Sequence, residues 1–194
     1  MYKLLTALLV LQMFAPAAQQ DALADSTTGV IVSPDGVLRA VIIPVDREKG
    51  FAANESRVEI RDRDGKLLIK EDYSSRDGEQ GYRVQEGQWT SDSQFFVYDT
   101  ASSGGHQPYR APTFFYSRQN NRIRNIEELT NRAVLSNEPP PFKIVAPHSV
   151  AIVSSPDEYS AGRSFDIDHS VIVTVNLQTG VISPPSKWPA DALP

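Results

Sequence analysis

A short turn followed directly by a β-type run occurs three times in this sequence, and this repeat constrains the fold more than any other feature. The turns are Ser33-Pro34-Asp35-Gly36, Thr90-Ser91-Asp92-Ser93 and Ala146-Pro147-His148-Ser149, which begin 57 and 56 positions apart. Val, Ile, Leu and Phe dominate the runs that follow, and helical periodicity is nearly absent. The repeat predicts an all-β chain in which each unit covers the apolar face of its neighbour.

A second landmark recurs in step with the first. The segments 58–67, 114–123 and 173–182 each read as strand, turn and strand, with Gly65, Asn121 and Gly180 in their turns. Gly and Asn tolerate the positive φ that tight hairpins require, so the three turns share one mechanism. The alternative is a chance similarity between generic hairpins.

Trp89-Thr90-Ser91-Asp92-Ser93 and the strand after it, together with Ser33–Gly36, resemble the motif of the TolB-type, WD-like β-propeller repeat. The resemblance covers roughly residues 28–185 and weakens in the third unit, where His148 stands in the Asp position. It implies four-stranded blades and indicates only a fold, because such repeats serve in envelope scaffolds, peptidases and protein-binding modules alike.

The predicted fold is therefore all-β, with antiparallel sheets in three blade-like repeats spanning about 28–85, 86–141 and 142–185. Known propellers close with about four to eight blades. Three units allow a propeller-like open stack, a six-bladed ring of two copies, or a small sandwich. One short helix is expected at 125–135, with Asn125 and Glu128 at the spacing of a capping box.

The first 24 residues have the pattern of a secretory signal peptide. Lys3 precedes an apolar stretch of 11 residues, and small-residue sites follow at 15–17 and 22–24. We expect cleavage to leave one domain, 25–194, in the bacterial periplasm or outside the cell, and an uncleaved amphipathic anchor is the alternative. No later stretch approaches 18 apolar residues, so stable membrane insertion of the processed chain is not expected.

The composition excludes several classes of function. The net charge of −5 argues against general nucleic-acid binding, and the absence of Cys removes thiol nucleophiles, thiolate metal sites and disulfides. Nucleophile-elbow, phosphate-loop and zinc-protease motifs do not occur in the sequence. These observations favour a non-enzymatic protein without a cofactor.

The most site-like segment is 100–112, in which His106, Tyr109 and Arg110 follow a Gly pair. The Arg110 guanidinium suits a carboxylate or phosphate and the Tyr109 ring suits stacking on a peptide, although an ordinary inter-strand loop would contain the same residues. Asp166 and Asp168 are weak candidates for a calcium site, against the simpler interpretation of a polar edge strand.

The function favoured by the sequence is an exported module that binds a protein or peptide partner in the bacterial cell envelope, as a monomer or homodimer. One alternative is a structural subunit that completes a propeller by dimerisation. The others are a hydrolase and a calcium-dependent carbohydrate binder that use the His and Asp residues.

Overall fold

The computed structural model describes residues 29–45, 55–76, 80–103, 112–130, 142–154, 171–184 and 186–187. Strands and one short helix make up most of these residues, as predicted. The helix, α1 (Ile126–Thr130), has five residues, and the described part of the chain holds no helix long and apolar enough to cross a membrane.

The strands form three separate four-stranded antiparallel sheets, each taken from one continuous part of the chain. The first sheet contains β1 (Gly29–Val32), β2 (Leu38–Pro44), β3 (Ser56–Asp62) and β4 (Leu67–Asp72). The second contains β5 (Tyr82–Trp89), β6 (Phe95–Ser102), β7 (Thr113–Ser117) and β8 (Arg122–Asn125). The third contains β9 (Phe142–Ala146), β10 (Ser149–Ser154), β11 (Val171–Asn176) and β12 (Ser186–Lys187).

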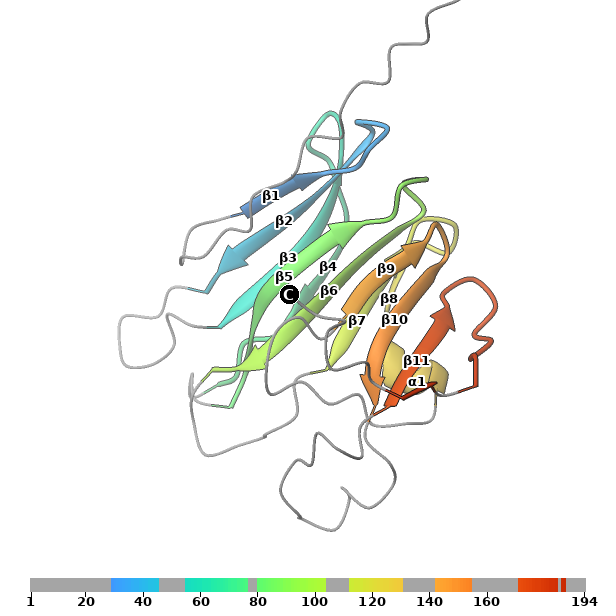
Figure 1. The fold of residues 1–194 in the computed structure, drawn as a ribbon. Helices are drawn as coiled ribbons and strands as arrows, with labels where there is room; N and C mark the ends of the chain where they lie inside the picture. The colour runs from blue at the N-terminus through green and yellow to red at the C-terminus, as the bar shows by residue number, and fades with distance from the viewer. Residues whose placement is uncertain are drawn as a thin grey trace, which may run out of the picture.

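The three sheets are stacked face to face in chain order (Figure 1). In the first pair, β1 lies beside β5 and β4 beside β8, so the two sheets are stacked in the same orientation. The arrangement confirms the predicted fold class of three blade-like antiparallel sheets.

Two hydrophobic cores hold the stack together. The core between the first and second sheets contains Ile60, Trp89, Phe96, Tyr98 and Tyr116 among its buried residues. The core between the second and third sheets is built from buried side chains of both sheets, which include Phe95, Val97, Phe115, Phe142, Val150 and Val173. Alternate residues of β6 belong to the two cores, so its first six residues are all buried.

The hairpin turns match the sequence prediction in backbone conformation. Gly65, Asn121 and Gly180 have φ values of 85°, 47° and 73°. Gly36 and Ser93, which occupy the same place in the first two repeated turns, also have positive φ, at 69° and 61°. Asn125 begins the helix as predicted, because its Oδ1 accepts a hydrogen bond from the Glu127 N–H at 2.8 Å.

The repeats differ from the sequence alignment in two places. In the third sheet only Pro147 and His148 separate β9 from β10, so this turn is shorter than the first two. The aligned segments in the third strands are also displaced by one residue. Asp62 pairs with Leu38, and the equivalent pair in the second sheet is Ser117 with Phe95. A β-bulge between Ile60 and Arg61 also shifts the register of β3 with β4.

Candidate functional site

The sequence-predicted binding residues lie outside the described residues. His106, Tyr109 and Arg110 fall in the connection between β6 and β7, and Asp166 and Asp168 fall in the connection between β10 and β11. Both connections join the second strand of a sheet to its third strand. The described residues instead show how the sheets that carry these connections are joined, and which surfaces they leave open.

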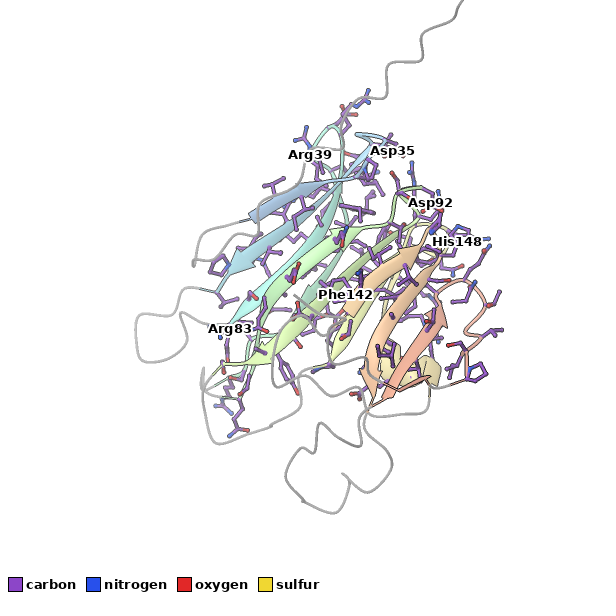
Figure 2. All side chains as sticks on the ribbon, viewed as in Figure 1. Asp35, Arg39, Arg83, Asp92, Phe142 and His148 are labelled. Atoms are coloured by element: carbon purple, nitrogen blue, oxygen red, sulfur yellow. The ribbon has the colours of Figure 1, made fainter. Side chains whose placement is uncertain are left out.

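The three repeated turns lie in a row at one end of the stack, together with the β7–β8 turn. We call the residues that join them the turn row: Asp35, Ser93, Asp92 and His148 from the repeated turns, and Arg118 from the β7–β8 turn. Figure 2 shows Asp35, Asp92 and His148 at this end of the three sheets and Arg83 at the opposite end.

Local hydrogen bonds build the first two turns in the same way. Ser33 Oγ accepts from the Leu38 N–H at 2.9 Å, and Thr90 Oγ1 accepts from the Phe95 N–H at 3.0 Å. In each turn the same hydroxyl also donates to the turn carboxylate, at 2.7 Å. The repeated hydroxyl and Asp residues therefore stabilise each turn through hydrogen bonds within that turn, independently of the contacts between sheets.

Asp35 connects the first sheet to the second. Its backbone N–H donates to Ser93 Oγ at 3.0 Å, and its carboxylate receives Arg118 Nη1 at 2.5 Å. Partial burial raises the pKa of Asp35, but hydrogen bonds from Ser33 and Arg118 outweigh this effect and hold the pKa well below its ordinary value. The Asp35 carboxyl group is therefore ionised at neutral pH.

Asp92 connects the second sheet to the third in a related way. Its Oδ2 lies 2.6 Å from His148 Nε2. Desolvation would raise the pKa of Asp92, but hydrogen bonds from Thr90, Gln94 and His148 lower it overall. His148 stands at the Asp position of the repeat, so a histidine replaces the motif carboxylate in the contact between these two turns.

A second joint between the first two sheets lies at the end opposite the turn row. The fully buried Glu55 carboxylate accepts hydrogen bonds from the Ser75 N–H at 2.9 Å, the Gly81 N–H at 2.8 Å and Ser103 Oγ at 3.3 Å. A Cβ on Gly81 would lie 2.4 Å from the Glu55 carboxylate, so the joint requires glycine there. Glu55 could not be predicted from the sequence, because nothing in its local pattern distinguishes it from an exposed loop residue.

Two tyrosines, the fully buried Tyr98 and the partly buried Tyr73, support the same contact between sheets. Tyr73 and Tyr98 share a hydrogen bond between their hydroxyls at 2.6 Å. Burial raises the pKa of both phenols, so both remain neutral. The first two sheets are therefore fixed to each other at both ends and along the middle.

Asp99 is a buried carboxylate that faces the third sheet. Its Oδ1 accepts from the Glu86 N–H at 2.8 Å, whereas its Oδ2 and the neighbouring Thr113 Oγ1 have no hydrogen-bond partner in the described part of the chain. Burial raises the pKa of Asp99 to about 7.

The first sheet has one side that points away from the second sheet, and we call this side the outer face. Its residues form three rows across the strands: Val32–Arg39–Arg61–Leu67, Val30–Val41–Glu59–Lys70 and Ile43–Arg57–Asp72.

Glu59 is held between two arginines on this face. Its side chain is only 5% exposed and accepts from Arg57 Nε at 3.1 Å and Arg61 Nε at 2.8 Å. The alternation of charged and apolar residues over 57–61 was the available signal, since period-two spacing places the three charges on one face.

No protein-family model and no curated protein matches this sequence. Solved structures with a similar chain path are β-propellers. The β-propeller domain of the Trilobed protease from Pyrococcus furiosus is 8% identical with a TM-score of 0.47, over 84% of this chain and 44% of that chain. The periplasmic gluconolactonase of Pseudomonas aeruginosa is 15% identical with a TM-score of 0.47, over 83% of this chain and 39% of that chain. A chain of the mitotic checkpoint complex is 12% identical with a TM-score of 0.41, over 95% of this chain and 49% of that chain.

The present chain therefore spans less than half the length of each of these proteins. Its three consecutive four-stranded antiparallel sheets, stacked in chain order on two shared cores, are the topology of propeller blades. The chain has a β-propeller-type fold with three blades.

Proposed function

We propose that this protein is an exported β-propeller module that binds a protein or peptide partner in the bacterial cell envelope. One observation carries the proposal. All five exposed large hydrophobic side chains among the described residues belong to the two terminal units: Val30, Val32 and Leu67 on the first sheet, Val145 on the third sheet, and Val181 in the segment that follows β11. Apolar side chains gathered at the ends of a repeat stack are typical of surfaces that contact another molecule.

The joints between the first two sheets support a binding role. Asp35 at one end and Glu55 at the other fix these sheets to each other, so residues in the connections would be presented by a rigid scaffold. Within this proposal, His106, Tyr109 and Arg110 are the first candidates for partner contact, with Asp166 and Asp168 as weaker candidates for a cation. The TolB-type resemblance of the turns and the signal-like first 24 residues support an envelope location.

Ring closure by a second copy is less well supported than a separate partner. In the second sheet, Phe96 and Tyr116 are paired across β6 and β7 and pack on the first sheet. At the equivalent positions of the first sheet, the paired residues are Arg39 and Arg61. Charged residues at these central positions are typical of a terminal repeat, which does not require another repeat to cover it.

The test is a cross-linking pull-down from bacterial envelope extract with the processed chain as bait. We expect recovery of a defined partner, which the Tyr109→Ala/Arg110→Ala double variant loses, whereas a control pair in the exposed β7–β8 turn, Gln119→Ala/Asn120→Ala, retains it. Unchanged capture by the double variant would show that the loop assignment is wrong. Capture of nothing above the background of an unrelated bait would overturn the binding proposal itself.

A further inference from the structure

The outer face of the first sheet carries a charge opposite in sign to that of the whole chain. Four cations, Arg39, Arg57, Arg61 and Lys70, lie on it against two carboxylates, Glu59 and Asp72. The chain as a whole has a net charge of −5. A local positive surface on an acidic protein favours anionic groups and steers their approach.

Two of these guanidiniums are fixed in place before any partner arrives. Glu59, almost completely buried, accepts from both Arg57 and Arg61, and Arg61 Nη1 also donates to the Gly65 carbonyl at 2.7 Å. Arg57 donates to Glu59 through its Nε, and it lies opposite Asp72, whose pKa Arg57 and Lys70 help to lower. Arginine side chains fixed in this way lose little conformational entropy when they bind a carboxylate.

Aliphatic side chains flank the cations at both edges of the sheet. Val30 and Val32 on β1 are 52% and 43% exposed, and Leu67 on β4 is 41% exposed. The face therefore offers three arginines on its central strands and Lys70 on the edge strand β4, with aliphatic side chains on both edge strands. This pattern fits a protein surface better than a free anion.

The charges also distinguish between the occupants of this face. A second copy that presented its own outer face would bring like charges together, and the outward side of the third sheet carries Lys143 beside Ala151 and Thr174. The two carboxylates of the outer face are already engaged within it, Glu59 by Arg57 and Arg61 and Asp72 by the attraction of Arg57 and Lys70. The complementary surface must be acidic and must carry aliphatic side chains.

We propose that the outer face docks an acidic segment of a partner protein in which carboxylates alternate with aliphatic residues. The carboxylates would bind Arg39, Arg57 and Lys70, and the aliphatic side chains would pack on Val30, Val32 and Leu67. This inference rests on the proposed binding function and identifies the surface and the partner chemistry.

The probe is a synthetic peptide of about twelve residues that alternates glutamate and valine, titrated into the processed full chain at low ionic strength. We expect saturable binding that weakens as salt rises from about 0.05 to 0.3 M, since exposed charges are screened over that range. We expect Arg39→Glu/Lys70→Glu to weaken binding roughly tenfold or more, because both cations then repel the peptide.

The matched control is Arg122→Glu/Arg124→Glu, which makes the same change of charge on two exposed residues of β8 in the second sheet. It should change the affinity by no more than about twofold. Val32→Ser should weaken binding by about twofold to fivefold without altering charge, since it removes one apolar contact. Circular dichroism and thermal unfolding confirm that each variant is folded.

Three results would overturn the inference: no peptide binding by the unmodified chain, an equal loss in the β8 control, or binding of anionic phospholipid vesicles without binding of the peptide. Concentration-dependent dimerisation abolished by Arg39→Glu/Lys70→Glu would assign the face to a second copy instead. The envelope pull-down separates this inference from the proposed function. A partner still captured by the Arg39→Glu/Lys70→Glu variant leaves the binding function intact and shows that the outer face is not its site.

Discussion

The outer face of the first sheet and the corresponding face of the second sheet have the same backbone pairing but opposite side-chain chemistry. Val32, Arg39 and Arg61 form one row in the first sheet, and Trp89, Phe96 and Tyr116 form the same row in the second. The aromatic row is buried in a core, whereas the charged row faces away from the stack. Hydrogen bonding thus defines the blade, and the side chains on one face decide whether that blade is an interior or a terminal member.

The largest expected effect comes from truncating the aromatic row. Phe96 is fully buried and packs against Trp89 and Tyr98, so Phe96→Ala should lower the free energy of unfolding by about 3–5 kcal/mol through lost burial and a cavity. Arg39→Ala, at the equivalent exposed position, should change it by less than about 0.5 kcal/mol. Urea unfolding monitored by tryptophan fluorescence measures both values, and equal effects would contradict the assignment of interior and terminal faces.

A second comparison concerns the buried carboxylates of the two sheets. Glu59 is neutralised by two arginines, whereas burial raises the pKa of Asp99 from 3.8 to about 7. Between these pH values the folded chain holds a proton that the unfolded chain has lost, so stability should fall as the pH rises from about 4 to 7 and then level off. The upper limit of this loss is about 4 kcal/mol, at ~1.4 kcal/mol per pKa unit.

Asp99→Asn tests this prediction, because the amide mimics the protonated carboxyl at every pH. The variant should match the natural chain near pH 4 and exceed its stability above pH 7. Urea unfolding curves collected across this range would show parallel pH dependences if Asp99 does not titrate near neutrality.

Gly87 and Val30 occupy equivalent positions, opposite Tyr98 and Val41 respectively. A Cβ on Gly87 would lie 2.5 Å from Phe96 Cζ, whereas Val30 is exposed. Gly87→Val should therefore destabilise the fold by about 1–3 kcal/mol by displacing the buried ring. Val30→Gly is the matched control and should cost less, about 1 kcal/mol or below. A tolerated Gly87→Val in chemical denaturation would mean that the contact between the sheets is looser than described.

The smallest effect concerns the repeated turns. Ser93 has a φ of 61°, which is strained for a residue other than glycine, and its hydroxyl accepts a hydrogen bond from the Asp35 N–H. Ser93→Gly relieves the strain and loses the bond, so the net change should stay within about 1 kcal/mol. Ser93→Ala loses the bond and keeps the strain, and should be less stable than Ser93→Gly by about 1 kcal/mol. A thermal unfolding series of the three chains ranks them.

Local chemistry made much of the fold predictable from the sequence. Three turns could be predicted from Gly65, Asn121 and Gly180, because few residues tolerate positive φ. The start of the helix could be predicted from Asn125, because its side chain can cap the first turn. The β-bulge after Ile60 and the shortened turn at Pro147 were not predictable, because both depend on how neighbouring strands pair.

The candidate site was less predictable than the fold. Asp35 and Arg118 meet across sheets from positions far apart in the chain, and no local pattern links them. The structural role of Glu55 comes from Gly81 and Ser103, which belong to the second blade and lie far from Glu55 in the sequence.

The strand β6 contributes to both cores, and this has a consequence for how the molecule opens. Separation of the first and second sheets would expose Phe96 and Tyr98, and separation of the second and third sheets would expose Phe95 and Val97. The loss of either core would therefore uncover one face of β6. Amide protons of β6 should accordingly exchange with solvent only when the whole chain unfolds, whereas the terminal strands β1 and β12 exchange through local fraying. Because β6 belongs to both cores, we expect the three units to unfold in one cooperative transition.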